Sequence, residues 1–281
     1  MESACGELRS LALAGSSWRA LRPAAQLFGV RKARPPCSRA ACQYNTDMPA
    51  KRDPLAKVDK LPARAAKYAP VSAALTAVYG QLDWSRNQDG LDELVSCILS
   101  QSTNDSNRDR AFARLKDHYD DWAAVRSADL EELTGVIRPA GLANQKAPRI
   151  QEALAAIYDH AGDYNIDFLE AMSLADAKAW LVSLRGIGPK TAAIVLCFAY
   201  GRPAFPVDTH VFRVGKRIGF LPAKISADNA HPVMEAITPP DDYYQFHIQL
   251  IQHGRDTCHA RKPACDRCPI PAHCDYFAAL G

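Results

Sequence analysis

The residue best placed for covalent chemistry is Lys190, which begins a helix directly after a glycine-containing turn. The turn is a Gly-x-Gly segment within residues 184–188, between two helical patterns. Glycine adopts positive φ without steric cost and leaves backbone N–H groups uncovered, so this segment predicts a tight hairpin. Its amides and the N-terminus of the next helix, with Pro189 at the first position, form an anion site suited to a phosphate. A lysine here meets an unfavourable helix dipole, which favours its neutral, nucleophilic amine over a merely solvated ammonium.

A carboxylate, Asp208, follows one helix later in Pro206-Val207-Asp208-Thr209-His210. An aspartate at this position is a good helix N-cap, and capping would hold its side chain in one place. A fixed carboxylate stabilises positive charge that develops beside it, or takes up protons. His210 and His253 are expected to be packing residues without chemistry.

Four cysteines near the end of the chain suggest a metal centre. Cys258, Cys265, Cys268 and Cys274 have the spacing C-x6-C-x2-C-x5-C. Four thiolates can hold a tetrahedral Zn²⁺, but zinc sites more often use paired C-x2-4-C knuckles separated by a longer spacer. The compact spacing favours an iron–sulfur cluster, with zinc as the alternative.

Together, the hairpin, the Val-Asp-Thr-His segment and the cysteine run resemble the helix-hairpin-helix DNA glycosylases, and among them the endonuclease III branch, over roughly residues 65–281. The resemblance implies that Lys190 attacks C1′ of a deoxyribose, expels the base and leaves a Schiff base that permits β-elimination of the 3′ phosphate. It gives Asp208 the role of charge stabiliser or proton acceptor. It also implies that the four cysteines hold a [4Fe–4S] cluster with a structural role.

The resemblance also assigns the contacts with DNA. Glycosylases extrude the target nucleotide and fill the gap with inserted side chains. The family has a glutamine after its second helix and a leucine after a glycine. Gly141-Leu142 matches the latter, whereas a gapless alignment anchored on Asp105 puts Ser102, not Gln101, at the glutamine position. The family usually has proline where this chain has Arg185, and often a basic residue where it has Pro189. Arg185 is therefore expected to add a phosphate contact. The expected DNA-binding residues are Arg185, Gly186, Ile187, Gly188, Gln101, Leu142, Arg261 and Lys262.

The expected partner is double-stranded DNA with a damaged base or an abasic site, bound by a monomer inside the cell. By analogy with the family, the substrates are oxidised or ring-saturated pyrimidines. Two alternatives stay open. One is an adenine or mismatch glycosylase of the same fold, although such relatives commonly lack the nucleophilic lysine. The other is a non-catalytic damage sensor in which the hairpin binds phosphate and the cysteines hold a structural metal.

Helical spacing of apolar residues predicts the elements that position these groups. No β alternation or internal repeat occurs, so the fold class is all-α. The expected helices begin near Pro70 and cover residues 91–100, 106–119, 129–136, 144–161, 173–184, 189–200, 209–220, 229–237 and 241–254. The resemblance implies a helical barrel domain at 83–201. It also implies a cluster domain built from 64–82 and 202–281, with Asp208 near the groove between the two.

Composition is that of an ordinary globular protein, with 48% apolar and 23% charged residues and a net charge of +3. The sequence has no run of about 18 uncharged apolar residues, so no membrane-spanning helix is expected. Residues 1–47 carry seven basic and three acidic residues, so DNA binding would need a local basic face elsewhere. Residues 1–63 are expected to be a disordered leader and linker; the first 47 resemble a transit peptide, a tail, or sequence upstream of a true start at Met48. Cys97 and Cys197 lie in apolar helical patterns and are expected to be buried thiols.

Overall fold

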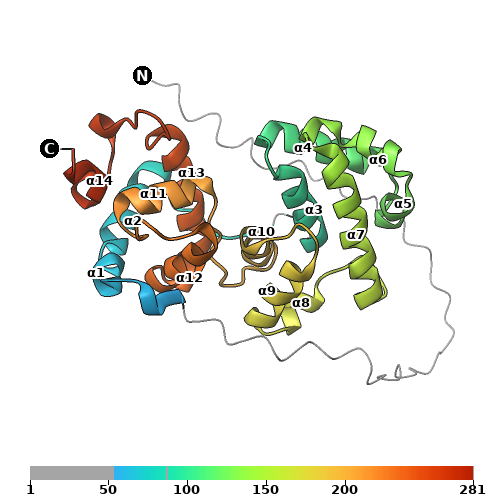
Figure 1. The fold of residues 1–281 in the computed structure, drawn as a ribbon, viewed down its shortest axis with the longest axis horizontal. Coiled ribbons are helices and arrows are strands. Elements are labelled where there is room, and N and C mark those ends of the chain that lie inside the picture. Colours follow the sequence, from blue (N-terminus) through green and yellow to red (C-terminus); the bar gives the residue numbers. More distant parts are fainter. Residues whose placement is uncertain (1–53, 87, 281) are drawn as a thin grey trace.

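The helices lie close to where the spacing of apolar residues places them, and they form two lobes (Figure 1). The structure, a computed structural model, describes residues 54–86 and 88–280, and this part of the chain contains no β-strand. The all-α prediction is therefore confirmed. The helices are α1 (Leu61–Ala65), α2 (Tyr68–Tyr79), α3 (Gly90–Ser100), α4 (Asp105–His118), α5 (Trp122–Ser127), α6 (Leu130–Val136), α7 (Ala143–Ala161), α8 (Phe168–Ala171), α9 (Leu174–Ser183), α10 (Pro189–Ile194), α11 (Thr209–Ile218), α12 (Ala227–Ile237), α13 (Tyr243–Asp256) and α14 (Asp275–Ala278). Short 3₁₀ turns are η1 (Pro54–Lys57), η2 (Arg138–Ala140), η4 (Pro240–Asp242), η5 (Cys265–Arg267) and η6 (Pro271–His273), and η3 (Val195–Ala199) is a π-helical continuation of α10.

Side-chain caps fix where several of these helices begin. The Asn104 side chain accepts a hydrogen bond from the Asn107 amide at 2.8 Å and starts α4. Ser173 caps α9: its hydroxyl accepts from the Asp176 amide at 3.1 Å and donates to the Asp176 carboxylate at 2.7 Å. Such caps satisfy backbone N–H groups that have no partner within the helix. The predicted starts of α4 and α9 are thereby confirmed to within one residue.

The structure differs from the sequence prediction in the short elements. Helices α1, α5 and α8 and the turn η1 each span four to six residues, which is too short for an apolar period to appear. Part of the expected linker is helical, because Leu55, Val58 and Leu61 pack against the core of the C-terminal lobe. The remainder of the predicted leader, residues 1–53, lies outside the described residues.

Two separate hydrophobic cores account for the two lobes. One core draws on α3 to α10, with Leu94, Ile98, Leu115, Ile150 and Leu181 fully buried. The other combines α2 with α11 to α13 through residues such as Leu75, Val211, Val233 and Phe246. Both ends of the described chain thus meet in one lobe. The limits 83 and 201 that the resemblance implies for the barrel stay predictions.

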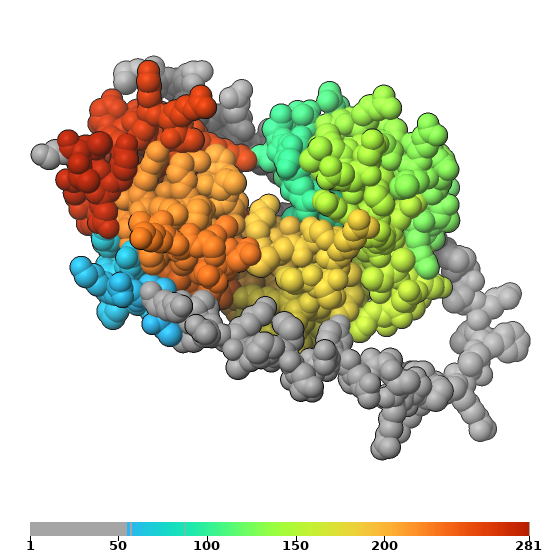
Figure 2. Space-filling model, in the orientation of Figure 1, coloured from blue at the N-terminus to red at the C-terminus, as the bar shows by residue number. Residues whose placement is uncertain are grey.

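Helix α10 lies between the lobes (Figure 1) and packs against α3 and α9 on one side and α12 on the other. Figure 2 shows a hollow between the surface formed by α11 to α13 and the surface formed by α3 to α7. Helix α10, which carries Lys190, lies between these two surfaces (Figure 1 and Figure 2). None of the helices in the described part of the chain has both the length and the apolar character needed to cross a membrane.

Candidate active site and DNA interface

The Gly-x-Gly hairpin joins α9 to α10 as the sequence predicts. Ile187 is the buried anchor of the turn, 4% exposed, and its amide donates to the Leu184 carbonyl at 3.0 Å. Gly186 has φ +81°, a conformation that L side chains rarely adopt, and a Cβ atom there would lie 2.8 Å from Cδ of Arg149. Glycine is therefore required at position 186 by both backbone conformation and packing.

Gly188 differs from the expectation that both glycines are needed for positive φ. Its φ is −103°, which any residue can adopt, and it is the N-cap of α10, with Pro189 at the start of the helix. A Cβ atom at this position would meet nothing within 4 Å. The space in front of the amides at the start of α10 is thus open, as an anion site at a helix N-terminus requires.

The charges of Lys190 and Asp208 both act on the buried ring of His247. His247 of α13 is 1% exposed, and its Nδ1–H donates to the Pro206 carbonyl at 2.9 Å. Burial lowers the pKa of His247 to about 4; the charge of Asp208 opposes this shift and the charge of Lys190 adds to it. The starts of α10 and α11 therefore both lie within electrostatic reach of His247. The Asp208 carboxylate also caps α11, accepting from the Val211 amide at 2.7 Å, so its predicted N-cap role is confirmed.

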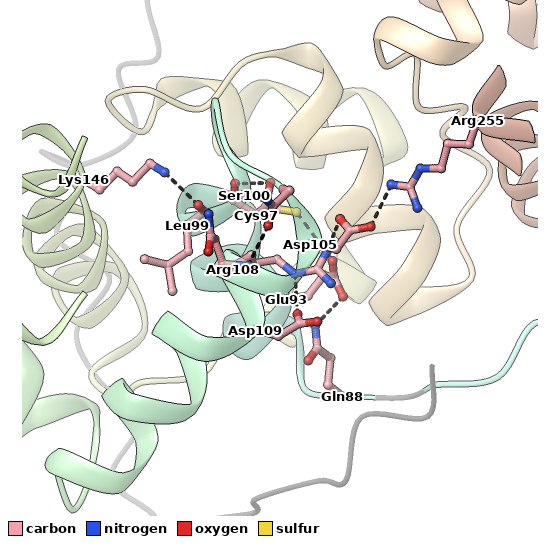
Figure 3. Close-up of polar contacts among 12 residues, drawn as sticks. Gln88, Glu93, Cys97, Leu99, Ser100, Asp105, Arg108, Asp109, Lys146 and Arg255 are labelled. Carbon is pink, nitrogen blue, oxygen red and sulfur yellow. Dashed lines mark hydrogen bonds and ion pairs between the residues drawn. The ribbon is translucent and has the colours of Figure 1, made fainter. Parts of the chain in front are cut away.

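A partly buried acid of the same lobe, Glu93, lies where the charge of Lys190 reaches it, and the motifs did not reveal it. Glu93 of α3 accepts from Nε2 of Gln88 at 2.5 Å and from the Cys97 thiol at 3.5 Å (Figure 3). Burial raises the pKa of Glu93, while the charges of Arg108 and Lys190 oppose the rise. Glu93 and Cys97 are one helical turn apart on the same face of α3. A polar pair at that spacing is the signal that would have identified them.

The residues expected to enter the duplex lie beside the hairpin. Nε2 of Gln101 donates to the Gly186 carbonyl at 2.9 Å, and its Oε1 accepts from Arg149 at 3.1 Å. Ser102 follows it with φ +55° and an exposed side chain. Leu142, the N-cap of α7, is 51% exposed and has φ +49°. Gln101 is thus held against the hairpin, whereas Ser102 and Leu142 project from strained turns.

The expected basic contacts occupy three exposed positions. Arg185 is exposed and pairs with Glu152 of α7 at 2.7 Å. Arg261 and Lys262 are exposed in the loop between Cys258 and Cys265. An exposed ion pair such as Arg185–Glu152 is weak, so Arg185 can readily exchange Glu152 for a more highly charged anion.

The four cysteines of the C-terminal run line one cavity, together with residues of α11, α13 and α14. Burial raises the pKa of Cys268, and the neighbouring Cys274, Cys258 and Cys265 add to the rise. Arg217 of α11 donates to Sγ of Cys258 at 3.2 Å and to the His259 carbonyl at 2.6 Å. Within residues 54–86 and 88–280, no group of three or more His, Cys, Asp and Glu side chains is arranged to hold a metal ion.

The other cysteines and histidines have packing positions. Cys97 and Cys197 are 5% and 2% exposed, which confirms that they are buried thiols. His253 is buried, its Nε2 lies 3.8 Å from Sγ of Cys268, and burial lowers its pKa to about 4. His210 packs beside Gly254, where burial lowers its pKa.

Comparisons with known proteins agree with this arrangement. The model of the HhH-GPD superfamily, base excision DNA repair proteins, matches residues 95–240. The endonuclease III of Sulfolobus acidocaldarius is 34% identical over 186 residues, 66% of this chain and 81% of that protein. The endonuclease III of Escherichia coli is 34% identical over 184 residues, 65% of this chain and 82% of that protein. A putative DNA glycosylase of Arabidopsis thaliana is 32% identical over 181 residues, and the match spans 62% of that protein.

Comparison of the three-dimensional structure with solved structures also finds endonuclease III. A solved structure of a non-covalent endonuclease III–DNA complex superimposes with a TM-score of 0.64 at 27% identity, covering 76% of this chain and 97% of that one. The matched residues 95–240 include the hairpin, Lys190 and Asp208. The chain therefore belongs to the HhH-GPD superfamily of base excision DNA repair proteins, in which it is an endonuclease III-like helix-hairpin-helix DNA glycosylase.

Proposed function

We propose that this enzyme removes oxidised pyrimidines from duplex DNA and then cleaves the strand 3′ to the resulting abasic site. The observation that carries the proposal is that Lys190, at the start of α10, and Asp208, at the start of α11, both influence the pKa of the buried His247 ring. An amine and a carboxylate that reach one site can act on one sugar, the first as nucleophile and the second on the charge or the protons. A structural relative is described as a trapped endonuclease III–DNA covalent intermediate, which supports a covalent step in this chain too.

In the proposed reaction the Lys190 amine forms a bond to C1′ as the C1′–N bond to the base breaks, and the base leaves with the electron pair and gains a proton. The bound amine then loses one proton, the C1′–O4′ bond breaks as O4′ gains a proton, and a protonated imine forms between Lys190 and C1′. A base then removes a C2′ proton, the C3′–O bond breaks, and the 3′ phosphate leaves. Asp208, fixed by its cap on α11, stabilises the positive charge near C1′ or accepts these protons.

The hairpin and the exposed loops supply the expected grip on the duplex. The open amides at Gly188 and the side chain of Arg185 would contact phosphate, and Arg261 and Lys262 would contact the backbone from the cysteine loop. Ser102 or Gln101, with Leu142, would fill the space left by the extruded nucleotide. The enzyme would act as a monomer on damaged or abasic double-stranded DNA, wherever in the cell that DNA lies.

We propose that Cys258, Cys265, Cys268 and Cys274 hold a [4Fe–4S] cluster. In favour of the fit, all four cysteines line one cavity, and three of them raise the pKa of the fourth, Cys268. Arg217 also donates a hydrogen bond to Sγ of Cys258. When bound, the cluster would cross-link the loop and fix the positions of Arg261 and Lys262. Iron and acid-labile sulfide assays distinguish it from zinc: four of each per chain supports the cluster, and one zinc without sulfide contradicts it.

Borohydride trapping tests the reaction. Oligonucleotides with thymine glycol or an abasic site are incubated with the wild type, Lys190→Ala and a matched Lys224→Ala variant, which alters an exposed lysine of the other lobe. We expect a covalent adduct with the wild type and Lys224→Ala and none with Lys190→Ala. Base release without an adduct would instead indicate a monofunctional glycosylase, and binding without base release a damage sensor.

A further inference from the structure

Lys146 of α7 is a fully buried lysine whose amine binds two backbone carbonyl groups. The residue is 1% exposed, and Nζ donates to the carbonyls of Leu99 and Ala140, both at 2.8 Å (the first is drawn in Figure 3). Burial lowers the pKa of Lys146 to about 8, and the charge of Arg149 adds to the shift. An amine in so unfavourable an environment is retained only where its hydrogen bonds matter.

The two carbonyls belong to the ends of two different helical segments. Leu99 lies in the last turn of α3, and Ala140 ends the 3₁₀ turn η2. Carbonyls at helix C-termini have no partner within the helix, and a cationic donor satisfies them well. Lys146 therefore acts as a shared C-terminal cap for two elements that are far apart in the sequence.

Each capped carbonyl immediately precedes one of the projecting turns. Ser102, three residues after Leu99, has φ +55°, and Leu142, two residues after Ala140, has φ +49°. Left-handed conformations of non-glycine residues are strained and persist only when the surroundings hold them. Lys146 supplies one such restraint to both turns at once.

The hairpin is attached to the same assembly. Arg149, one turn after Lys146 on α7, donates to Gln101, which donates to the Gly186 carbonyl. The end of α3, the start of α7 and the hairpin are thus linked by two side chains of α7. This arrangement sets the distance between the two turns relative to the expected phosphate site.

We propose that Lys146 is a positioning residue for nucleotide extrusion, holding residues 100–103 and Gly141–Leu142 at a fixed separation so that both enter the duplex as one rigid unit. The inference rests on the proposed function. Opening a base step requires inserted side chains that do not yield, because unstacking opposes them. A hydrophobic side chain at position 146 would fill the space but leave both carbonyls unbonded and the turns unrestrained.

Gln151, also on α7, offers a matched control. Its Nε2 donates to two backbone carbonyls, those of Val125 at 3.2 Å and Ala128 at 2.8 Å. It therefore makes the same kind of contact from the same helix, but to the segment that ends α5. Lys146→Met and Gln151→Met remove comparable bonds, and only the first affects the projecting turns.

The experiment compares wild type, Lys146→Met, Lys146→Arg and Gln151→Met. Duplexes carry 2-aminopurine beside a tetrahydrofuran abasic analogue, thymine glycol or a natural abasic site. Unstacking of 2-aminopurine reports extrusion without requiring chemistry. We expect Lys146→Met to lose the fluorescence rise and to slow base release from paired thymine glycol on the order of ten- to a hundredfold, as displacement of a positioned group does. Trapping of Lys146→Met on the natural abasic site should fall much less. Lys146→Arg should recover part of the loss in extrusion and base release. Gln151→Met should resemble wild type.

A second measurement covers the case in which Lys146→Met does not fold. The milder Lys146→Arg is then combined with Leu142→Ala: if Lys146 acts through the wedge, its effect on extrusion disappears once Leu142 is gone. Equal effects with and without Leu142, or equal losses for Lys146→Met and Gln151→Met, would overturn the inference. Failure of the proposed lyase function looks different, because the wild type would then extrude the analogue but trap no abasic DNA.

Discussion

Arg255 at the end of α13 lies 2.7 Å from the Asp105 carboxylate at the start of α4 (Figure 3), so this ion pair, like that of Lys178 with Glu235, joins the two lobes. Both side chains are about half exposed. The pair stands at the border of the cleft, and Asp105 also contacts Arg108 at 3.4 Å. A contact of this kind sets the relative position of the lobes more than it stabilises either one.

Arg255→Met should therefore change stability little. Exposed ion pairs contribute about 0–1 kcal/mol, so we expect the free energy of unfolding to fall by less than about 1 kcal/mol in urea denaturation. The distribution of distances between the lobes, measured by fluorescence transfer between labels on α7 and α12, should broaden. A loss above about 2 kcal/mol would mean that the pair is part of a larger buried network.

Gly188→Ala should separate folding from DNA binding. The backbone conformation at 188 is open to alanine and the added Cβ meets no protein atom, so stability should change by less than about 0.5 kcal/mol. If phosphate binds the amides there, the methyl group would obstruct it and weaken duplex affinity about tenfold. Gly186→Ala is the contrasting variant, expected to destabilise by about 1 kcal/mol or more because of its φ and its contact with Arg149. Unchanged DNA affinity in Gly188→Ala would remove this phosphate site.

The two roles of Asp208 can be separated by substitution. Asparagine caps helices as well as aspartate, so Asp208→Asn should retain stability within a few tenths of a kcal/mol, whereas Asp208→Ala should lose about 1 kcal/mol. Both remove the charge, and single-turnover base release should fall by on the order of a hundredfold or more in each. Activity that follows stability instead of charge would leave Asp208 as a cap alone.

His247 should make stability depend on pH. Its pKa is about 4 in the folded protein against 6.5 for an ordinary histidine, because it is buried. Between these values the unfolded chain binds more protons, so the free energy of unfolding should decrease as pH falls from 6.5 towards 4, by up to about 1.4 kcal/mol per pH unit. His247→Gln should lessen this dependence in urea titrations at several pH values and leave the part contributed by buried His253, whose pKa is also lowered to about 4. An identical pH slope in the variant would assign it to other groups.

Arg217→Met should loosen the cysteine loop. The guanidinium donates to Sγ of Cys258 and to the carbonyls of His259 and Ala260. We expect the variant to lose iron to a chelator faster, and hydrogen exchange of residues 258–274 to increase. Residues of α3 to α9 should exchange as in wild type, since they belong to the other core. Equal iron loss from variant and wild type would show that Arg217 does not hold the loop.

The sequence alone determined the helices long enough to show an apolar period, the cap at Asp208, and the motifs themselves. These features are local: a cap needs an amide three residues away, and a hairpin needs a glycine at one backbone angle. For the same reason the family was recognisable from Gly186, Lys190, Asp208 and four cysteines without any knowledge of how they meet.

Only the tertiary structure decided which distant groups share an environment. Glu93, Lys146 and His247 carry no motif, and each acquires its properties from burial against another helix. The ion pair of Arg255 with Asp105 spans 150 residues of sequence, and the bond from Lys146 to Leu99 spans 47. Such contacts depend on how helices pack against one another, within one core for Lys146 and between the two cores for Arg255, and no periodicity in the chain encodes that packing. The spacing of residues thus specified which reactive groups are available, and packing specified which side chains hold those groups in position.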